Sequence, residues 1–355
     1  MKISNSVLLS IIVLVSFFAW YFPRKSQSFP NTKFCGVKKY KISNPEDILF
    51  IDDSHFLTGN SNGEVIKVNI NNSSMETILT AHDFNTNLLP GFICDGSYSK
   101  YQQCGRVLGI KSYGNDSVIM ANAYFGIFKY NLTDKTLELL VEINTFVDDL
   151  VKLNNGDILF TEASHFYKFH EYIYAHLRNE AFGTIYQYSP SSDIIEEYLQ
   201  FLYFPDGITI DEKFIYIAEV GTRSILISRK STKKEVFIDD LPLYPDNIGI
   251  NNGSLFVSGI ERSHTLEFLV NHPILIEFIL KITSPYIHLP IFYWLINKNG
   301  MFLEVDLRTR KIKRVFYDST QKVFAATSSI IIKNDDYWVG SVMSNYVTKL
   351  TLCKQ

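Results

Sequence analysis

The feature that most constrains the fold of this chain is a phrase that recurs along it. Each copy starts with an aromatic residue, a spacer and an acid, which lead into an apolar run, a polar turn and a second run of β-branched and aromatic residues. The clearest copies are FVDDLVKLNNGDILFTEA from Phe146, FPDGITIDEKFIYIAEV from Phe204 and YPDNIGINNGSLFVSGI from Tyr244. Strand-like runs separated by turn residues predict repeated antiparallel strand pairs.

Six such units can be placed in the chain, and their spacing indicates the architecture. They begin near Asn44, Arg106, Phe146, Phe204, Tyr244 and Val323. The second and third starts are 40 positions apart, as are the fourth and fifth, which matches the roughly 40–50 residues of a four-stranded propeller blade. Longer gaps hold insertions at residues 94–104, 164–183 and 264–295. We therefore predict an all-β fold, a six-bladed β-propeller with a helical insertion; a large sandwich or a mixed α+β fold is the alternative.

The first 23 residues contain an apolar run, Val7–Phe22, that includes no charged residue. Its 16 residues fall short of the roughly 20 that a spanning helix needs, so a retained anchor helix and a cleaved signal peptide both fit it. The aromatic residues at 20–22 suit a membrane interface and favour a retained hydrophobic anchor helix. Residues 24–33 are predicted to be a polar linker and residues 34–355 the propeller. The prediction is a single-pass membrane protein of the endoplasmic reticulum or cell surface with a lumenal or extracellular C-terminal domain, or a secreted protein if the segment is cleaved.

Glycosylation sequons and cysteines agree with an exported chain. Five asparagines stand in acceptor sequons, namely Asn71, Asn72, Asn115, Asn131 and Asn252. The four cysteines allow three pairings. Cys94 and Cys104 are close enough for a local loop, and a bond between Cys35 and Cys353 would tie the first and last blades together. Four free thiols are the alternative, although an oxidising compartment disfavours them.

The charge balance excludes one class of partner. The formal net charge is −3, and the chain has no basic stripe with interleaved aromatic residues. We therefore expect no nucleic-acid partner.

Oxygen-bearing side chains open several of the predicted inner strands. In a propeller these strands converge on a central channel, so residues at the same place in each strand face one another across the axis. The side chains concerned are Glu46, Asp148, Asp206, Asp246 and Asn247. Converging carboxylate and amide oxygens predict a calcium site, because Ca²⁺ prefers oxygen ligands. The alternative is turn formation, since Asp before Gly or Asn is also common in turns.

A family resemblance emerges from several of these stretches together. The motifs CGRVLGI, ANAYFGIFKYN, FVDDLVKLNNGDILFTEAS, FPDGITI, LPLYPDNIGI and YWVGSV occur in this order. The series resembles the strictosidine synthase-like family, and within it the animal branch of the adipocyte plasma membrane-associated protein group, which is related to the paraoxonases. The resemblance extends from about Cys35 to Leu352.

The resemblance implies a six-bladed propeller, often with an amino-terminal signal anchor. In paraoxonases a calcium ion in the central tunnel is held by Glu, Asn and Asp side chains, which map by position onto the same five residues. Asp148 and Asp206 depart from that pattern, which has Asn at both places, so the ligand set here is more acidic. Paraoxonases also join their chain ends by a disulfide, as Cys35 and Cys353 would here.

The resemblance bears on chemistry in two ways. The synthase uses a glutamate early in the last blade, but the corresponding stretch here, Val323–Ile332, has no carboxylate and offers Ser328 or Ser329. A hydroxyl is a poor general acid or base near neutral pH, so strictosidine-type condensation is disfavoured. The paraoxonase route, in which calcium polarises an ester or lactone carbonyl, remains open.

Paraoxonases also place a histidine near the position of the VLGI motif, where this chain has Gly109. The nearest histidines by sequence are His165, His170 and His176, and they are expected on the surface of the 164–183 insertion.

Two functions follow as hypotheses. The first is a calcium-dependent hydrolase of aryl esters or lactones with weak activity. The alternative is a non-catalytic binding module for a small apolar or lipid-like ligand. The apolar insertion at 264–295 is predicted to be a helical lid over the channel; the alternative is a second membrane contact beside the anchor.

Overall fold

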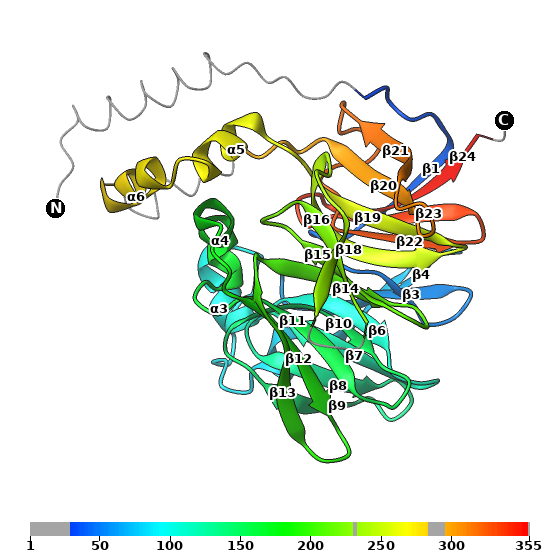
Figure 1. The fold of residues 1–355 in the computed structure, drawn as a ribbon. Coiled ribbons are helices and arrows are strands. Elements are labelled where there is room, and N and C mark those ends of the chain that lie inside the picture. Colours follow the sequence, from blue (N-terminus) through cyan, green and yellow to red (C-terminus); the bar gives the residue numbers. More distant parts are fainter. Residues whose placement is uncertain (1–28, 230–232, 283–294, 354–355) are drawn as a thin grey trace, which may run out of the picture.

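The computed structural model describes residues 29–229, 233–282 and 295–353 (Figure 1). The predicted signal segment at 1–23 lies outside the described residues, as do part of the predicted linker and the end of the 264–295 insertion. Within the described ranges, no helix is long and apolar enough to cross a membrane.

Six four-stranded antiparallel sheets are arranged as the blades of a propeller, which confirms the predicted fold class. The first three blades are β2 (Leu49–Phe50), β3 (His55–Gly59), β4 (Val65–Asn69) and β5 (Met75–Leu79); β6 (Val107–Ser112), β7 (Ser117–Asn122), β8 (Gly126–Asn131) and β9 (Thr136–Glu142); and β10 (Phe146–Lys152), β11 (Ile158–Ser164), β12 (Gly183–Ser189) and β13 (Ile194–Leu202). The fourth and fifth are β14 (Pro205–Ile210), β15 (Ile215–Glu219), β16 (Ser224–Ser228) and β17 (Lys234–Ile238); and β18 (Leu243–Asn251), β19 (Ser254–Glu261), β20 (Gly300–Asp306) and β21 (Ile312–Asp318). The sixth is β22 (Ser329–Lys333), β23 (Asp336–Gly340), β24 (Tyr346–Leu352) and β1 (Phe34–Lys41).

The ring closes in the sixth blade, where the first strand of the chain pairs with the last. β1 is the outer strand of this blade and runs antiparallel to β24, with Val37 opposite Leu350. A disulfide between Cys35 and Cys353 joins the ends of the same two strands, as predicted. In the chain-entropy model a bond across so long a loop contributes about 5 kcal/mol to stability.

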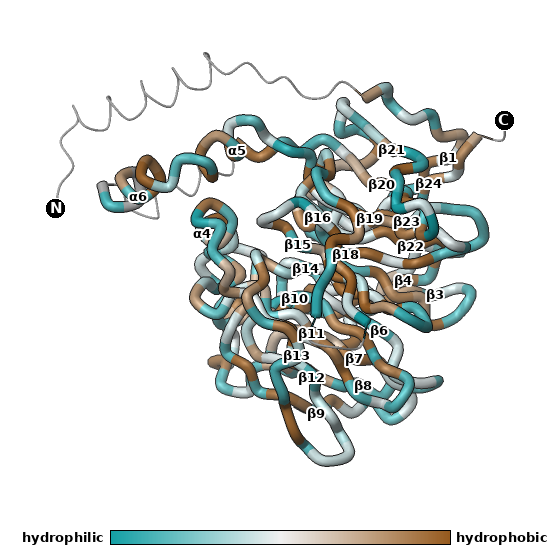
Figure 2. Tube along the Cα trace, viewed as in Figure 1, coloured by the Kyte–Doolittle hydropathy of each residue, from teal (hydrophilic) through white to brown (hydrophobic). Residues whose placement is uncertain are grey.

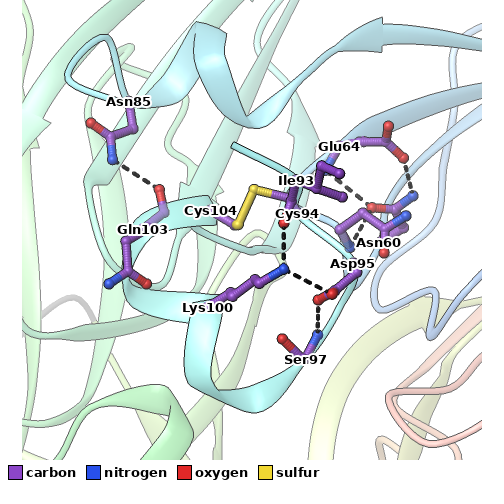
Figure 3. The surroundings of a disulfide bond; sticks show 11 residues. Asn60, Glu64, Asn85, Ile93, Cys94, Asp95, Ser97, Lys100, Gln103 and Cys104 are labelled. Atoms are coloured by element: carbon purple, nitrogen blue, oxygen red, sulfur yellow. Dashed lines mark hydrogen bonds and ion pairs between the residues drawn. A yellow bond between two sulfur atoms is a disulfide. The ribbon is translucent and has the colours of Figure 1, made fainter. Parts of the chain in front are cut away.

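The second predicted disulfide, between Cys94 and Cys104, organises the long connection from the first blade to the second. This connection includes α2 (Ala81–Phe84), the 3₁₀ turn η1 (Tyr98–Lys100) and α3 (Tyr101–Cys104). The Lys100 ammonium lies inside the loop, 2.8 Å from the Ile93 carbonyl oxygen and 2.8 Å from the Asp95 carboxylate (Figure 3). The loop ends just before Arg106, a residue of the site described below.

The core lies between neighbouring blades, whose sheets pack face to face. Leu159 and Ile185 of the third blade, for example, belong to one buried hydrophobic cluster with Ile217 and Leu226 of the fourth. Strands β15 and β16 are buried along their whole length because both of their faces are covered, which explains the imperfect alternation in the sequence. Hydrophobic colouring accordingly follows the strands through the body of the ring in Figure 2.

Helices gather over one face of the ring (Figure 1). The β11–β12 connection forms η2 (Phe169–Glu171) and α4 (Tyr172–Arg178), and the β19–β20 connection forms α5 (His264–Val270) and α6 (Pro273–Ile282). Proline fits the first turn of a helix, so Pro273 separates α5 from α6 without breaking either.

The helices form one packed cover. Ile173 of α4, Leu266 of α5 and Ile276 of α6 belong to a single buried cluster. An ion pair of 2.6 Å between Arg178 and Glu277 joins α4 to α6. The described part of the 264–295 insertion is therefore a lid, as predicted, and α4 of the 164–183 insertion belongs to it as well.

The five sequon asparagines lie at the opposite end of the blades. Each is at a turn between the first and second or the third and fourth strand of a blade, whereas the helices come from connections at the other end. Four of the five residues are exposed, and Asn131 is half-buried. Their glycosylation stays a prediction.

Candidate functional site at the mouth of the channel

The acids of the recurring phrase lie in β-bulges near the start of the inner strands. Two residues lie between Val147 and Leu150 on β10, whereas only one lies between their pairing partners on β11. Strands β14 and β18 have the same extra residue. A bulge redirects side chains and is common next to functional sites. The interpretation of these acids as turn formers is therefore wrong, because they lie within strands.

The extra residue creates two consecutive positions in β10, β14 and β18. We call these positions, together with the corresponding residue pairs of the other three units, the inner row and the outer row. The inner row consists of Glu46, Leu108, Asp148, Asp206, Asp246 and Ser328. The outer row consists of the residues that follow them, Asp47, Gly109, Asp149, Gly207, Asn247 and Ser329. Five of the inner-row residues, all but Ser328, line a single cavity beneath the lid.

The aromatic residues of the phrase form a wall of the same cavity. Phe146, Phe204 and Tyr244 line it, and the rings of the two phenylalanines contact each other with centroids 5.6 Å apart. Phe204 has a φ of 56°, a left-handed backbone conformation that is costly for a bulky residue and is concentrated at functional sites. The phrase therefore places an aromatic wall and an acidic base around one space.

The inner-row carboxylates lack sufficient compensation. Burial raises the pKa of Asp148, Asp206 and Asp246 well above the ordinary aspartate range. Repulsion between the acids raises these pKa values further. After burial, the largest effect on the pKa of Asp148 is the charge of Asp206. The corresponding effect comes from Asp246 for Asp206, and from Glu46 for Asp246. Four acids that face one space can all be ionised at neutral pH only if positive charge lies nearby.

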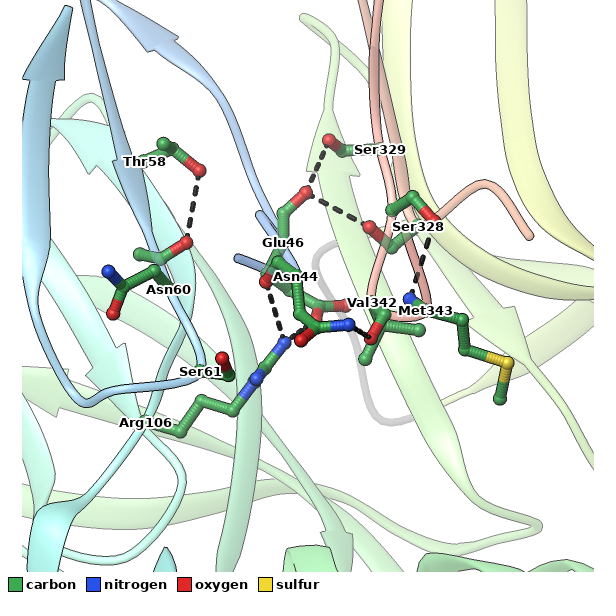
Figure 4. A network of polar contacts seen from close by, with 12 residues as sticks. Asn44, Glu46, Thr58, Asn60, Ser61, Arg106, Ser328, Ser329, Val342 and Met343 are labelled. Atoms are coloured by element: carbon green, nitrogen blue, oxygen red, sulfur yellow. Dashed lines mark hydrogen bonds and ion pairs between the residues drawn. The ribbon is translucent and has the colours of Figure 1, made fainter. Parts of the chain in front are cut away.

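Arg106 supplies one positive charge, and sequence reasoning did not identify it. Its Nη2 atom donates to Glu46 Oε2 at 3.0 Å and to the Asn44 carbonyl oxygen at 2.9 Å (Figure 4). The guanidinium is buried and lies over the rings of Tyr101 and Phe169, with its carbon 5.8 and 5.3 Å from their centroids. Even so, burial outweighs the arginine and leaves the pKa of Glu46 raised.

The two serines at the position of the synthase glutamate have structural roles. The hydroxyl groups of Ser328 and Ser329 both donate to the Glu46 carbonyl oxygen, at 3.0 and 2.7 Å (Figure 4). They therefore join the sixth blade to the first. Neither hydroxyl is arranged as an acid or base.

Two of the buried oxygen atoms that have no hydrogen-bond partner among the described residues belong to predicted ligands of the site. They are Oδ1 of Asp206 and Oδ1 of Asn247, and the amide Nδ2 of Asn247 is unpartnered too. The two residues are only 8% and 3% exposed. An unsatisfied buried polar group needs a physical reason, and a bound ion is one.

These observations fit a hard cation. A divalent ion would offset the excess charge of the acids and would give the orphaned oxygen atoms a partner. Within the described ranges, no three His, Cys, Asp or Glu side chains already stand together as a metal site. The ligand set predicted from the sequence, Glu46, Asp148, Asp206, Asp246 and Asn247, therefore stays a prediction, although its four acids do meet at one cavity.

The outer row has the opposite character. The Lys111 ammonium lies between two buried carboxylates, 2.5 Å from Asp47 Oδ2 and 2.8 Å from Asp149 Oδ1. Each carboxylate also accepts a backbone N–H of a following blade, that of Ile110 for Asp47 and that of Ile208 for Asp149, both at 3.0 Å. These contacts link the first four blades by side chains.

Glycine in the outer row makes this arrangement possible. A Cβ atom at Gly109 would come within 2.7 Å of Asp149 Oδ1. A Cβ atom at Gly207 would come within 2.6 Å of the Asp246 carbonyl oxygen and of the Asn247 Cα atom. The small residue in one blade therefore leaves room for the larger one in the next.

The remaining walls of the cavity are mostly apolar. Leu108, Ile173, Val220, Leu266 and Ile296 are among the residues that line it. Its volume is about 90 Å³, well below the roughly 300–1,000 Å³ of sites for drug-sized ligands. A compact apolar group fits this space, and a larger ligand requires movement of the lid.

The three histidines of the 164–183 insertion have different environments. His165 is exposed and lies beside Glu162, and His170 hydrogen-bonds with Gln102 and Tyr124. His176 lies on α4, is buried and lines the cavity. The expectation of surface positions is therefore wrong for His176, because α4 folds over the ring and this part of its surface faces inward.

Comparisons with known proteins agree with this architecture. A sequence model of the strictosidine synthase family matches residues 148–235, which include the acids of the third and fourth blades. A strictosidine synthase-like protein of Arabidopsis thaliana is 28% identical over 88% of this chain and 80% of its own length. The adipocyte plasma membrane-associated protein of Salmo salar is 26% identical over 88% of this chain and 77% of its own. The family resemblance predicted from the sequence is confirmed.

Solved structures extend the comparison to the fold alone. A gluconolactonase from Xanthomonas campestris superimposes with a TM-score of 0.57 at 12% identity, over 89% of this chain and 88% of its own. A calcium-binding protein, regucalcin, from Agrobacterium tumefaciens gives 0.56 at 10% identity, over 92% of this chain and 96% of its own. At such identities the shared property is the propeller.

Proposed function

Because this chain resembles the strictosidine synthase-like family over most of its length, we propose that it is a calcium-binding propeller that hydrolyses aryl esters or lactones with weak activity. The observation that supports this most directly is the cluster of Asp148, Asp206 and Asp246 beneath an apolar cavity, with charge that Arg106 offsets only in part. Calcium-binding and lactonase proteins among the structural neighbours are compatible with the proposal.

Each part of the site has a role in this proposal. Glu46, Asp148, Asp206, Asp246 and Asn247 would hold the ion, which supplies Lewis-acid polarisation of a carbonyl oxygen when it is bound. The aromatic residues Phe146 and Phe204 would pack against the apolar part of the substrate. The lid would exclude water other than the reacting molecule.

Strictosidine-type condensation has no place in the proposal. Amine–aldehyde condensation needs a group that transfers protons, and the hydroxyls of Ser328 and Ser329 are both engaged with the Glu46 carbonyl oxygen. The stretch Val323–Ile332 also contains no carboxylate that could transfer protons.

Calcium binding by the purified full chain is the first test. Calorimetry should show binding that Asp206→Asn weakens by at least tenfold, because the variant removes a charged ligand. Asp95→Asn, which changes an exposed acid of the disulfide loop, should bind like the wild type. Phenyl acetate and δ-valerolactone should then be hydrolysed in calcium and not in EDTA. No calcium binding, or turnover that persists in EDTA, would contradict the proposal.

The alternative function is a binding module without catalysis. The apolar lining and small volume of the cavity favour a small apolar or lipid-like ligand. Saturable binding of such a ligand, with no hydrolysis of any ester or lactone in calcium, would support this alternative.

The cellular location is part of the proposal. Two disulfides and no free cysteine indicate an oxidising compartment, and relatives are named as plasma membrane-associated. We propose attachment through the amino-terminal segment, with the propeller on the lumenal or extracellular side. Ile274 and Phe278 of α6 are 86% and 57% exposed, so the lid insertion is proposed as a further membrane contact.

A further inference from the structure

His176 is the one histidine among the described residues that line the cavity. It is 7% exposed and lies edge-on to the Tyr244 ring, with centroids 4.5 Å apart. Neither of its ring nitrogens has a hydrogen-bond partner among the described residues. A buried imidazole without partners gives up its hydrogen bonds to water and gains none in return, so its position needs a reason.

The charged groups around His176 do not satisfy it. Glu267 of α5 is the acid that acts on the pKa of His176. Its carboxylate, however, forms ion pairs with Arg223 and Arg262 at 3.1 and 3.4 Å. Burial lowers the pKa of His176 to about 4, with Arg223 acting in the same direction and Glu267 against it. The imidazole is therefore neutral at pH 7, and one nitrogen has a free lone pair.

His165 and His170, the other two histidines of the insertion, lack this combination. His165 is largely exposed and next to Glu162, whereas His170 is occupied by Gln102 and Tyr124. His176 alone among the three lines the cavity that the inner-row acids share. The lid thus places one neutral proton acceptor on the wall of that cavity.

We propose that His176 is a catalytic base that accepts a proton from the attacking water, an inference that rests on the proposed hydrolase function. The water oxygen forms a bond to the carbonyl carbon while its proton passes to the free ring nitrogen. The bond from that carbon to the leaving oxygen then breaks, and the imidazolium returns the proton to this oxygen. One ester and one water thus give one acid and one alcohol, and the imidazole is again neutral.

A pair of glutamine variants tests the proposal. His176→Gln keeps a hydrogen-bonding group of similar size but cannot take a proton at neutral pH, so kcat for phenyl acetate should fall by about 100-fold. KM and calcium affinity should change less than threefold. His165→Gln, in the same insertion, should retain wild-type kcat. A His176→Gln variant that folds, binds calcium and retains kcat overturns the inference while the hydrolase proposal stands.

A second measurement tests contact between His176 and the ligand without turnover. In the ¹⁵N-histidine-labelled full chain, the unreactive analogues acetanilide and δ-valerolactam should shift the ring signals that His176→Gln removes, and not those of His165. If the wild-type protein turns over no substrate, both the hydrolase proposal and the role of His176 as a base are wrong. The shift of the His176 ring signals then shows whether this residue still contacts a bound ligand. Analogues that bind without shifting these signals, or that do not bind at all, overturn the inference.

Discussion

The inner and outer rows of the bulges are one residue apart in the sequence, yet their acids have opposite environments. Asp47 and Asp149 of the outer row share the Lys111 ammonium and accept backbone N–H groups of neighbouring blades. Asp148 and Asp206 of the inner row face a cavity together with other acids, and burial and repulsion raise their pKa values. Two adjacent carboxylates of one strand can therefore take part in different interactions, one set within the fold and the other at the cavity.

The difference separates stability from function. A buried acid with a well-placed cation and several donors supports the fold, and removal of its partner is strongly destabilising. Buried acids without compensation reduce the stability of the fold and are typical of sites that bind or react. Glu46 lies between these cases, because it is in the inner row but has Arg106 beside it.

The largest effect is expected from Lys111→Met, which breaks the outer row. The variant leaves two buried carboxylates, Asp47 and Asp149, without their shared cation. We expect the free energy of unfolding to fall by about 4 kcal/mol, as measured by denaturant unfolding in EDTA. Lys129→Met, which removes an exposed ion pair with Glu138, serves as the control and should cost less than about 1 kcal/mol. Similar losses for the two variants would show that the outer row is not a stabilising unit.

Arg106→Gln tests the intermediate case of Glu46. The variant leaves a single buried carboxylate unpaired, so a loss of about 3 kcal/mol is expected in EDTA. Unlike the loss in Lys111→Met, this one should be partly restored by calcium, because an ion bound by the inner row would offset the freed charge. Arg106→Lys is the control, since it keeps the charge with fewer hydrogen-bond donors. No calcium effect on Arg106→Gln would place Glu46 with the structural acids.

Features that repeat locally could be predicted from the sequence. The phrase at Phe146, Phe204 and Tyr244 predicted inner strands and acids in phase because strand and turn chemistry acts over a few residues. The six blades, the two disulfides and the lid followed from spacing and composition. The inner row could be predicted for the same reason, because residues at the same place in each repeat face the central axis of the propeller.

Features that depend on distant partners or on one extra residue could not be predicted. Asp206 before Gly207 reads as turn chemistry, and only the pairing with β15 shows a bulge within a strand. Arg106 and Lys111 are single basic residues whose partners Glu46 and Asp47 lie 60 and 64 positions away. The inward position of His176 depends on how α4 packs over the ring, which no repeat encodes.

Substitution of one acid in each row should change stability with opposite signs. Asp149→Asn loses an ionic contact with Lys111 and should lower the free energy of unfolding by about 2 kcal/mol. Asp206→Asn removes a repelled carboxylate and should raise it by about 1 kcal/mol in EDTA, since a pKa shift of one unit corresponds to about 1.4 kcal/mol. Thermal unfolding in EDTA measures both. Destabilisation by both variants would mean that Asp206 is a structural acid.

The smallest expected effect is a pH dependence that comes mainly from the inner row, although burial also raises the pKa of Asp149 in the outer row. Asp148, Asp206 and Asp246 have pKa values raised above the unfolded value, so the folded chain holds protons that the unfolded chain has released. Stability in EDTA should therefore decrease as pH rises, by about 1 kcal/mol between pH 6.5 and 8. This window avoids His176, whose lowered pKa acts with the opposite sign between about 4 and 6.5.

Calcium should remove the slope, because ionised carboxylates bind the ion and protonated ones do not. Asp206→Asn should reduce the slope in EDTA more than Asp149→Asn, because Lys111 offsets part of the effect of burial on the pKa of Asp149. Unfolding midpoints measured across the window in EDTA and in calcium give both slopes. A flat profile in EDTA would mean that the inner-row acids are compensated without a metal ion, and the contrast between the two rows would then be one of position only.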